Sequence, residues 1–306
     1  MRDAISPASG DGLKPTLAEL VALRATAQRR PPPRKGRHGV AGPAQSNLRG
    51  RGMEYAESRE YVAGDDVRHI DWRLTARSGR THTKLFQAER ERLSLIVADT
   101  SPGLYFGTRV RFKSVQAARA AAVAVWTAIR DGDRVAILRG SHHEAPVPPA
   151  SGARGALRVL DALVRWYSQP PAEDAGLAVA LDHAVRLLRP GSRLLVLADA
   201  RSIAALPESR WPALAAHHEV VVLLLTDALE SEPPRQLLPF MASGQRIELD
   251  LGDGGQRQRW RDEFMGPVEQ ALESLPRRGV RVYSLQGDAP SEAWLPLLGR
   301  AQSQVA

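Results

Sequence analysis

Three aspartates follow apolar runs that each have the length of a buried strand: Asp99, Asp199 and Asp227. Ligands of an open α/β sheet bind outside the carboxyl ends of its strands, near the point where the strand order reverses. Acids gathered at that edge repel one another unless a cation or hydrogen-bond donors compensate their charge. The pattern therefore indicates a binding edge. The alternative is that each aspartate only caps the helix or turn that follows it.

The loop that begins at Asp99 offers a carboxylate and, at Ser101, a hydroxyl group, which are ligands that a hard cation prefers. It resembles the Asp-x-Ser-x-Ser loop of von Willebrand factor A-type domains, which coordinates Mg²⁺ at the metal-ion-dependent adhesion site. Asp199 matches the acid of that family's third loop. Gly103 and Leu177 stand where two further hydroxyl ligands are expected. The resemblance therefore implies a degenerate site that binds Mg²⁺ weakly or not at all.

Residues 51–92 form a stretch dense in charged and aromatic side chains, with no long helical period. Within it, the run Gly-Asp-Asp-x-Arg-x-Ile-Asp-Trp resembles the signature of the domain-of-unknown-function family fifty-eight, which lies just upstream of an A-type strand. On this resemblance the chain is identified as a member of that family over about residues 17–299. The residues assigned to this signature are Glu54, Arg59, Tyr61, Gly64, Asp65, Asp66, Arg68, Asp71, Trp72 and Arg77.

Two interpretations of the signature stay open. Guanidinium groups match carboxylates in pairs, and the indole of Trp72 is able to pack against a guanidinium face. Gly64 is expected at a turn with a positive φ, where Asp65 and Asp66 accept hydrogen bonds from the backbone. We favour a structural ion-pair network in which Trp72 is mostly buried. The alternative is a docking surface that a partner recognises.

Strands and helices alternate along the remainder of the chain, which favours an α/β fold with a mostly parallel sheet. The resemblance narrows this to a von Willebrand factor A-like, or Rossmann-like, sheet flanked by helices, with an irregular N-terminal extension packed on it. We predict a largely disordered basic segment with a short helix at 1–50, the signature extension at 51–92 and the A-type domain at 93–306.

Hydrophobic periodicity predicts some elements that can be compared directly with the structure. A spacing of three and four residues predicts a short amphipathic helix over 15–28 and one long helix over 256–275. A strand is also predicted at 246–249. We expect strand-sized apolar runs, such as 194–198 and 220–225, to form the sheet.

The composition excludes several classes of protein. The chain has 306 residues, 43% of them hydrophobic, and no cysteine, which rules out disulfides, thiolate metal sites and cysteine nucleophiles. Its apolar runs are shorter than the roughly 20 residues of a membrane span, and its first residues have no apolar leader region. We therefore expect a cytoplasmic protein that does not enter the membrane.

The net charge of +8 is concentrated at one end of the chain. Residues 1–51 carry ten Arg or Lys against three Asp or Glu, while the other 255 residues carry 32 against 31. A basic segment of this kind is compatible with nucleic-acid binding, but the near-neutral remainder does not favour a large nucleic-acid footprint.

The family resemblance implies a non-enzymatic protein-interaction module. Such a module is expected to act with a MoxR-type AAA+ ATPase in chaperone-like maturation or remodelling of an unidentified client protein. The edge at Asp99, Ser101 and Asp199 is then a partner-docking site, and Asp99→Ala is expected to be neutral or mildly stabilising. The alternatives are a metal-dependent hydrolase with Asp99, Asp199 and Asp227 as ligands, and nucleic-acid binding through the basic segment.

Overall fold

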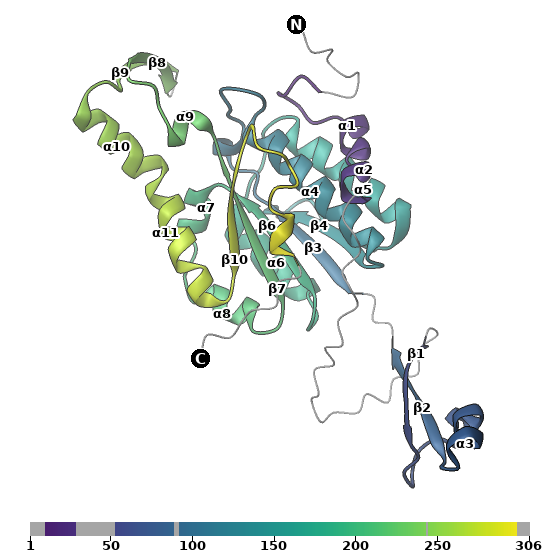
Figure 1. Cartoon of the computed structure of the whole chain (residues 1–306). Coiled ribbons are helices and arrows are strands. Elements are labelled where there is room, and N and C mark those ends of the chain that lie inside the picture. Colours follow the sequence, from purple (N-terminus) through teal and green to yellow (C-terminus); the bar gives the residue numbers. More distant parts are fainter. Residues whose placement is uncertain (1–9, 29–52, 89–91, 243, 299–306) are drawn as a thin grey trace, which may run out of the picture. The chain divides into compact units, whose positions relative to one another are not determined.

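The chain divides into two compact units in the computed structural model, which describes residues 10–28, 53–88, 92–242 and 244–298 (Figure 1). One unit comprises Met1–Arg34 and Arg92–Ala306, and the other comprises Lys35–Glu91. None of the helices in the described ranges is long and apolar enough to span a membrane.

A six-stranded sheet forms the centre of the larger unit. Its strand order is β10-β7-β6-β3-β4-β5, and every pair is parallel except β4 and β5. The chain runs from β3 to β4 and then returns to the other side of β3, so the strand order reverses between β3 and β6. The predicted α/β class is confirmed. The strands are β3 (Leu93–Ala98), β4 (Arg134–Arg139), β5 (Val147–Ala150), β6 (Arg193–Ala198), β7 (Glu219–Thr226) and β10 (Arg281–Gln286).

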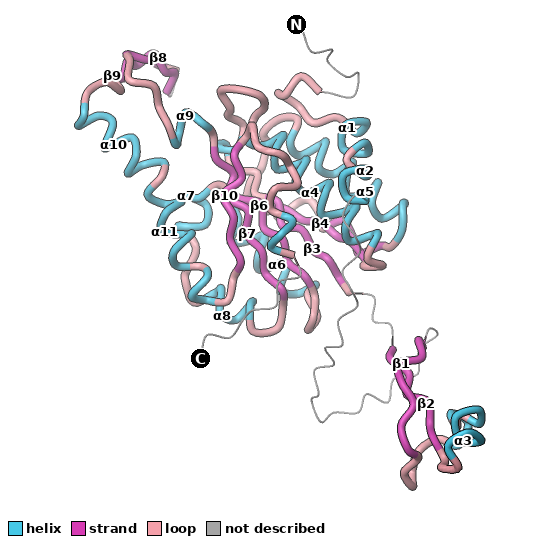
Figure 2. The backbone as a smooth tube through the Cα atoms, viewed as in Figure 1, coloured by secondary structure: helices cyan, strands magenta, loops and turns pink. Residues whose placement is uncertain are grey.

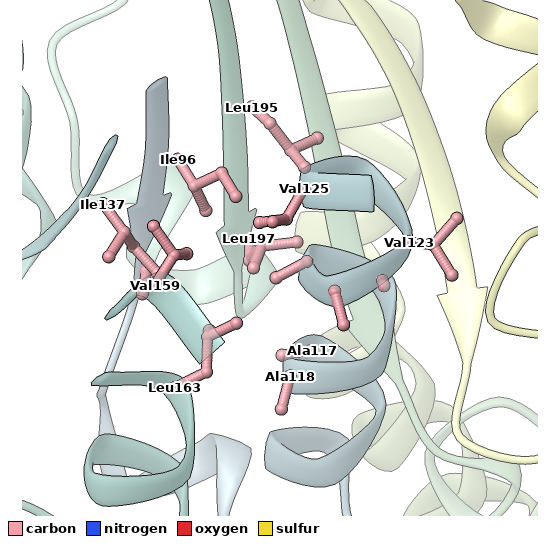
Figure 3. Packing of buried hydrophobic residues seen from close by; sticks show 14 of the residues in the cluster. Ile96, Ala117, Ala118, Val123, Val125, Ile137, Val159, Leu163, Leu195 and Leu197 are labelled. Atoms are coloured by element: carbon pink, nitrogen blue, oxygen red, sulfur yellow. The ribbon is translucent and has the colours of Figure 1, made fainter. Parts of the chain in front are cut away.

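Helices cover both faces of this sheet (Figure 2). Alternate residues of a strand point to opposite faces, so Ile96 joins one buried cluster while Leu95 and Val97 join the other. Figure 3 shows Ile96 and Leu197 of the sheet against the small residues of α4. The first cluster contains α1 (Leu17–Ala22), α2 (Arg24–Gln28), α4 (Lys113–Arg130) and α5 (Gly152–Tyr167); the second contains α6 (Gly176–Leu187), α7 (Ala200–Ala204), α8 (Arg210–Ala215) and α11 (Gly266–Ser274).

The helix predicted over 15–28 consists of two short helices, α1 and α2, that pack on α4. The indole Nε1 of Trp126 donates to the carbonyl of Leu20 at 3.0 Å, and Arg130 donates to the carbonyl of Ala27 at 2.7 Å. These bonds occupy carbonyl groups that the ends of such short helices leave without intrahelical partners. The first described segment of the chain is therefore part of the larger unit.

An insertion between β7 and α11 differs most from the sequence prediction. It contains α9 (Ala228–Ser231), an antiparallel hairpin of β8 (Leu237–Ala242) and β9 (Gln245–Asp250), and α10 (Gly254–Phe264). The predicted strand at 246–249 is β9, whereas its partner β8 was not predicted. The long helix expected over 256–275 is divided into α10 and α11 at Met265, because Pro267 cannot donate the backbone hydrogen bond that a continuous helix needs.

The smaller unit is not the irregular segment that the sequence suggested. Strands β1 (Met53–Glu60) and β2 (His82–Ala88) form an antiparallel pair, and η1 (Val67–His69) and α3 (Trp72–Ser78) lie between them in the sequence. Polar, alternating strands separated by a short helix have no strong hydrophobic period, and this pattern explains why the regular structure was missed.

Charged side chains form a compact cluster at the amino edge of the large sheet. Glu219 at the start of β7 accepts hydrogen bonds from Arg193 at 3.1 Å and Arg281 at 2.7 Å, and Arg92 lies 3.3 Å away. Burial raises the pKa of Glu219, but the three guanidinium groups outweigh burial and hold its pKa below the ordinary 4.5. The carboxylate is therefore charged, and it compensates three arginines from three strand ends.

We predict that Glu219→Gln lowers the free energy of unfolding by about 2 kcal/mol at neutral pH, because Arg193 then keeps only Asp133, 3.9 Å away, as an ion-pair partner. The folded-state pKa is depressed, so the stabilisation is complete above the unfolded-state pKa and is lost as the pH falls through the folded-state value. Urea unfolding should show the gap between wild type and variant closing toward about pH 3. The control Glu248→Gln changes an exposed carboxylate on β9 and should have no effect; an equal loss in both variants would contradict the prediction.

Candidate functional site

The ends of β3 and β6 are joined by a buried carboxylate. The side chain of Asp99 is only 2% exposed. Its Oδ2 accepts the backbone N–H of Asp199 at 3.0 Å, and its Oδ1 accepts the backbone N–H of Ser101 at 2.9 Å. The hydroxyl of Ser101 also donates to Oδ2 at 3.1 Å. The structure thus brings together the three residues that the sequence assigned to a degenerate metal site.

A lysine supplies the positive charge at this edge. Lys113, the first residue of α4, donates from Nζ to Oδ2 of Asp199 at 2.9 Å and to Oε1 of Glu230 at 2.7 Å, and its side chain is 2% exposed. The sequence analysis expected either a cation or hydrogen-bond donors to compensate these acids, and it did not identify Lys113. Lys113 is one of only four lysines among 42 cationic residues. The occurrence of this uncommon residue type at the start of a predicted helix is the sequence feature that could have identified it.

Burial and charge act in opposite directions on these groups. Burial lowers the pKa of Lys113, but Glu230 and Asp199 outweigh it and raise the pKa of the amine, so the ammonium form is stable. Burial raises the pKa of Glu230 and opposes the lowering by Lys113. Burial also raises the pKa of Asp99, against the hydrogen bonds that its carboxylate accepts. The site is therefore an ionic cluster in which the contacts of Lys113 with Asp199 and Glu230 stabilise the ammonium form of the lysine.

The third strand-end acid, Asp227, has a local structural role. Its Oδ1 accepts the backbone N–H of Leu229 at 2.9 Å, while Oε2 of Glu230 accepts the backbone N–H of Asp227 at 2.9 Å. This reciprocal arrangement is a capping box at the start of α9. Oδ2 of Asp227 also accepts the backbone N–H of Thr108 at 3.0 Å. For this residue the capping alternative agrees with the structure.

The side chains do not fit the Mg²⁺ site that the A-type resemblance implies. The ammonium of Lys113 contacts the carboxylate of Asp199, which would otherwise face the metal. A Cβ atom at Gly103 would lie 3.2 Å from Oδ2 of Asp199, so a serine has little room there. Leu177 is buried in the core beneath the other face of the sheet. Within the described residues, no group of three His, Asp or Glu side chains is placed to hold a metal ion.

A cleft of about 720 Å³ opens beside this ionic cluster. Gly103, Lys113 and Glu230 line it on the side of the sheet, and the β8–β9 hairpin and α10 line it on the other side. Trp260 anchors this wall, because its Nε1 donates to the carbonyl of Leu229 at 3.1 Å. The apolar residues of the wall are Phe240, Met241, Ile247, Leu249, Leu251, Trp260 and Phe264.

The acids of the signature in the smaller unit act mainly on their own backbone. Asp65 accepts the N–H of Val62 at 3.0 Å and pairs with Arg59 at 2.7 Å, and the hydroxyl of Tyr61 donates to the carbonyl of Asp65 at 3.3 Å. Gly64 has the expected positive φ of 110°. The geometry agrees with a structural role for this turn.

Two more acids of the signature start helices. Asp66 accepts the N–H of Arg68 at 3.0 Å at the start of η1. Asp71 accepts the N–H of Leu74 at 3.1 Å at the start of α3, and it also accepts from the hydroxyl of Ser58 at 3.0 Å. The side chain of Glu54 lies outside the described residues.

The expectation that Trp72 is mostly buried is wrong for the described part of its unit. Its side chain is 69% exposed, and Arg68 and Arg77 are exposed as well. Among the described side chains of this unit only Thr83 is buried. Among the described contacts of the signature, Arg59 forms an ion pair with Asp65, while Asp66 and Asp71 accept backbone N–H groups.

The protein is an α/β protein with a mostly parallel six-stranded sheet, and Asp99 and Asp199 follow the two strands between which the strand order reverses. Ligands of open α/β sheets generally bind at such a point. The comparisons assign the family: the model described as "Protein of unknown function DUF58" matches residues 57–270. The chain belongs to the DUF58 family, as its signature predicted.

The relatives carry no assigned function. Uncharacterized proteins of Mycobacterium bovis and Mycobacterium tuberculosis are 32% identical over 190 residues, which cover 60% of this chain and 58% of theirs. The chain therefore matches a little over half the length of these relatives. No solved structure matches the chain.

The contacts of Asp99 change the expected effect of its removal. Asp99→Ala would leave the backbone N–H groups of Ser101 and Asp199 without their acceptor, and a buried donor without a partner costs about 1–3 kcal/mol. We now predict that Asp99→Ala lowers the free energy of unfolding by about 2 kcal/mol, in place of the neutral effect expected from charge repulsion alone. Urea unfolding measures it; Asp99→Asn, which keeps one acceptor oxygen, should lose less. Equal stability of Asp99→Ala and wild type would contradict the prediction.

The exposure of Trp72 also yields a test. Trp72→Ala should lower the free energy of unfolding by less than about 1 kcal/mol, as is usual for a surface position. Leu163→Ala in the buried core is the matched control and should cost about 2–5 kcal/mol. Thermal or urea unfolding of the whole chain distinguishes the two, and a loss at Trp72 that approached the loss at Leu163 would show that the indole is covered in solution.

Proposed function

We propose that this chain is a non-enzymatic protein-binding module that acts in the cytoplasm with a MoxR-type AAA+ ATPase, in chaperone-like maturation or remodelling of a client protein. The observation that carries the proposal is the cleft of about 720 Å³ at the carboxyl edge. Its wall is aromatic and aliphatic, and such clefts receive large apolar side chains of a partner. Membership of the DUF58 family, through the resemblance described above, supports the choice of partner.

The contacts of the strand-end acids favour binding over catalysis. A general base or nucleophile needs a group that is available to a substrate. Asp99 accepts from two backbone N–H groups, Asp199 pairs with Lys113, and Asp227 caps α9. The metal-dependent hydrolase that would use these three residues as ligands is therefore the weaker alternative.

The nucleic-acid alternative rests on the basic charge of residues 1–51, and most of these basic residues lie outside the part of the chain that the structure describes. Only 10–28 of this segment lies within the described residues. In that range Glu19 forms an ion pair with Arg119, and the carbonyl of Ala27 accepts from Arg130. The contacts of this helical segment are thus with α4 of its own unit, which favours a structural role for it.

The test is association of the full chain with a MoxR-type ATPase from the same organism. Met241 is 72% exposed and lines the cleft, so Met241→Asp places an unpaired carboxylate on its apolar wall. We expect this variant to bind the ATPase at least about tenfold more weakly, with the wild-type melting temperature. Leu237→Asp is the matched control, because Leu237 is 58% exposed on the same strand and does not line the cleft.

Two results would contradict the proposal. Undiminished binding by a folded Met241→Asp variant would place the docking site elsewhere on the chain. Absence of any association between the wild-type chain and the ATPase, measured by calorimetry and co-purification with and without ATP, would remove the partnership itself.

A further inference from the structure

We propose that Lys113 is a built-in substitute for the metal ion at the carboxyl edge, so that the edge keeps a fixed positive charge without binding a divalent cation. The Nζ atom of Lys113 lies 2.9 Å from Oδ2 of Asp199 and 2.7 Å from Oε1 of Glu230. Asp199 directly follows β6, and Glu230 lies in α9, which follows β7. The ammonium group thus bridges acids of two neighbouring strand ends, as a metal ion would.

The position of the ammonium group is fixed by the backbone. Lys113 is the first residue of α4, and its N–H donates to the carbonyl of Phe106 at 2.8 Å. The loop from β3 to α4 is held again at Thr108, whose N–H donates to Asp227 at 3.0 Å. With both the loop and the helix start anchored, the lysine side chain enters the cluster from a defined point. Its 2% exposure shows that it is part of the interior and not a surface cation.

The oxygens of the cluster are already occupied by donors within the chain. The second oxygen of Asp199 accepts the N–H of Arg201 at 3.0 Å, and the second oxygen of Glu230 accepts the N–H of Asp227 at 2.9 Å. Both oxygens of Asp99 accept hydrogen bonds from Ser101, and one also accepts from Asp199. A divalent ion would have to displace these donors and to approach a buried ammonium group of like charge. Both steps cost free energy, and binding at an exposed surface site would require neither of them.

The experiment is a comparison of metal responses in the full chain without any partner. We expect that about 10 mM Mg²⁺ or Mn²⁺ shifts the melting temperature of the wild type by less than about 1 °C, and that neither ion binds saturably in calorimetry. Lys113→Met removes the charge and keeps the length of the side chain, so Asp199 and Glu230 lose their cation. This variant should melt lower without metal and should gain about 4 °C or more when either ion is added.

Three further variants isolate the cause. Lys113→Arg keeps the positive charge and should remain unresponsive to metal. Lys113→Met combined with Glu230→Gln removes one of the two acids and should lose most of the gained response. Lys14→Met is the matched control, because Lys14 is an exposed lysine of the same unit, and it should behave as the wild type does.

Each outcome decides the proposal. A metal-dependent rise in the melting temperature of Lys113→Met, or folding of this variant only in the presence of metal, supports it. Saturable binding of either ion to the wild type overturns it, and so does a Lys113→Met variant that shows no response to metal, folded or unfolded. Because no partner is present, the result does not depend on the proposed function, and either can fail without the other.

Discussion

The ammonium group of Lys113 is the contact on which the carboxyl edge of the sheet depends. Without a cation, Asp199 and Glu230 would face each other in an interior where like charges repel strongly. With the ammonium 2.9 Å and 2.7 Å from them, the starts of α4, α7 and α9 are held at one point. The fold of the loop from β3 to α4 follows from this constraint, because the loop must return the first residue of α4 to the same edge.

The charges at the opposite edge of the sheet are arranged with the signs reversed: an anion lies among cations there, whereas a cation lies among anions at the carboxyl edge. There Glu219 is surrounded by three arginines, from the starts of β6 and β10 and from the residue before β3. The cavity beside this cluster has a volume of about 150 Å³, against about 720 Å³ at the carboxyl edge. Both clusters stabilise the arrangement of the strands, and the larger of these two cavities lies at the carboxyl edge.

The sequence predicts those parts of the molecule that follow from local pattern and topology. The apolar runs of β3, β6 and β7 and the period of α4 are unambiguous, and parallel strands must bring Asp99 and Asp199 to one edge. The DUF58 signature was also readable from its residues. Lys113 was missed because a lysine at the start of a helix has no local sign of burial. Its role follows only from tertiary contacts with acids 86 and 117 positions away. The exposure of Trp72 was missed because the burial of a side chain depends on tertiary contacts, which the local sequence pattern does not give.

The proposed replacement of a metal ion by the ammonium group of Lys113 bears on how the proposed partner would bind at this edge. A metal bound by protein ligands keeps open coordination positions, and a partner carboxylate is able to occupy one of them. An ammonium group has three donors, and Lys113 uses two of them on Asp199 and Glu230. Little charge-based recognition is left at this point. For the proposed partner, the main source of affinity would then be burial of apolar surface, at roughly 25 cal/mol per Å², and the hairpin and α10 place such a surface directly beside the cluster. The fixed cation and the apolar wall therefore have different roles in the proposed function: the first stabilises the edge, and the second lines the cleft in which we propose that a partner binds.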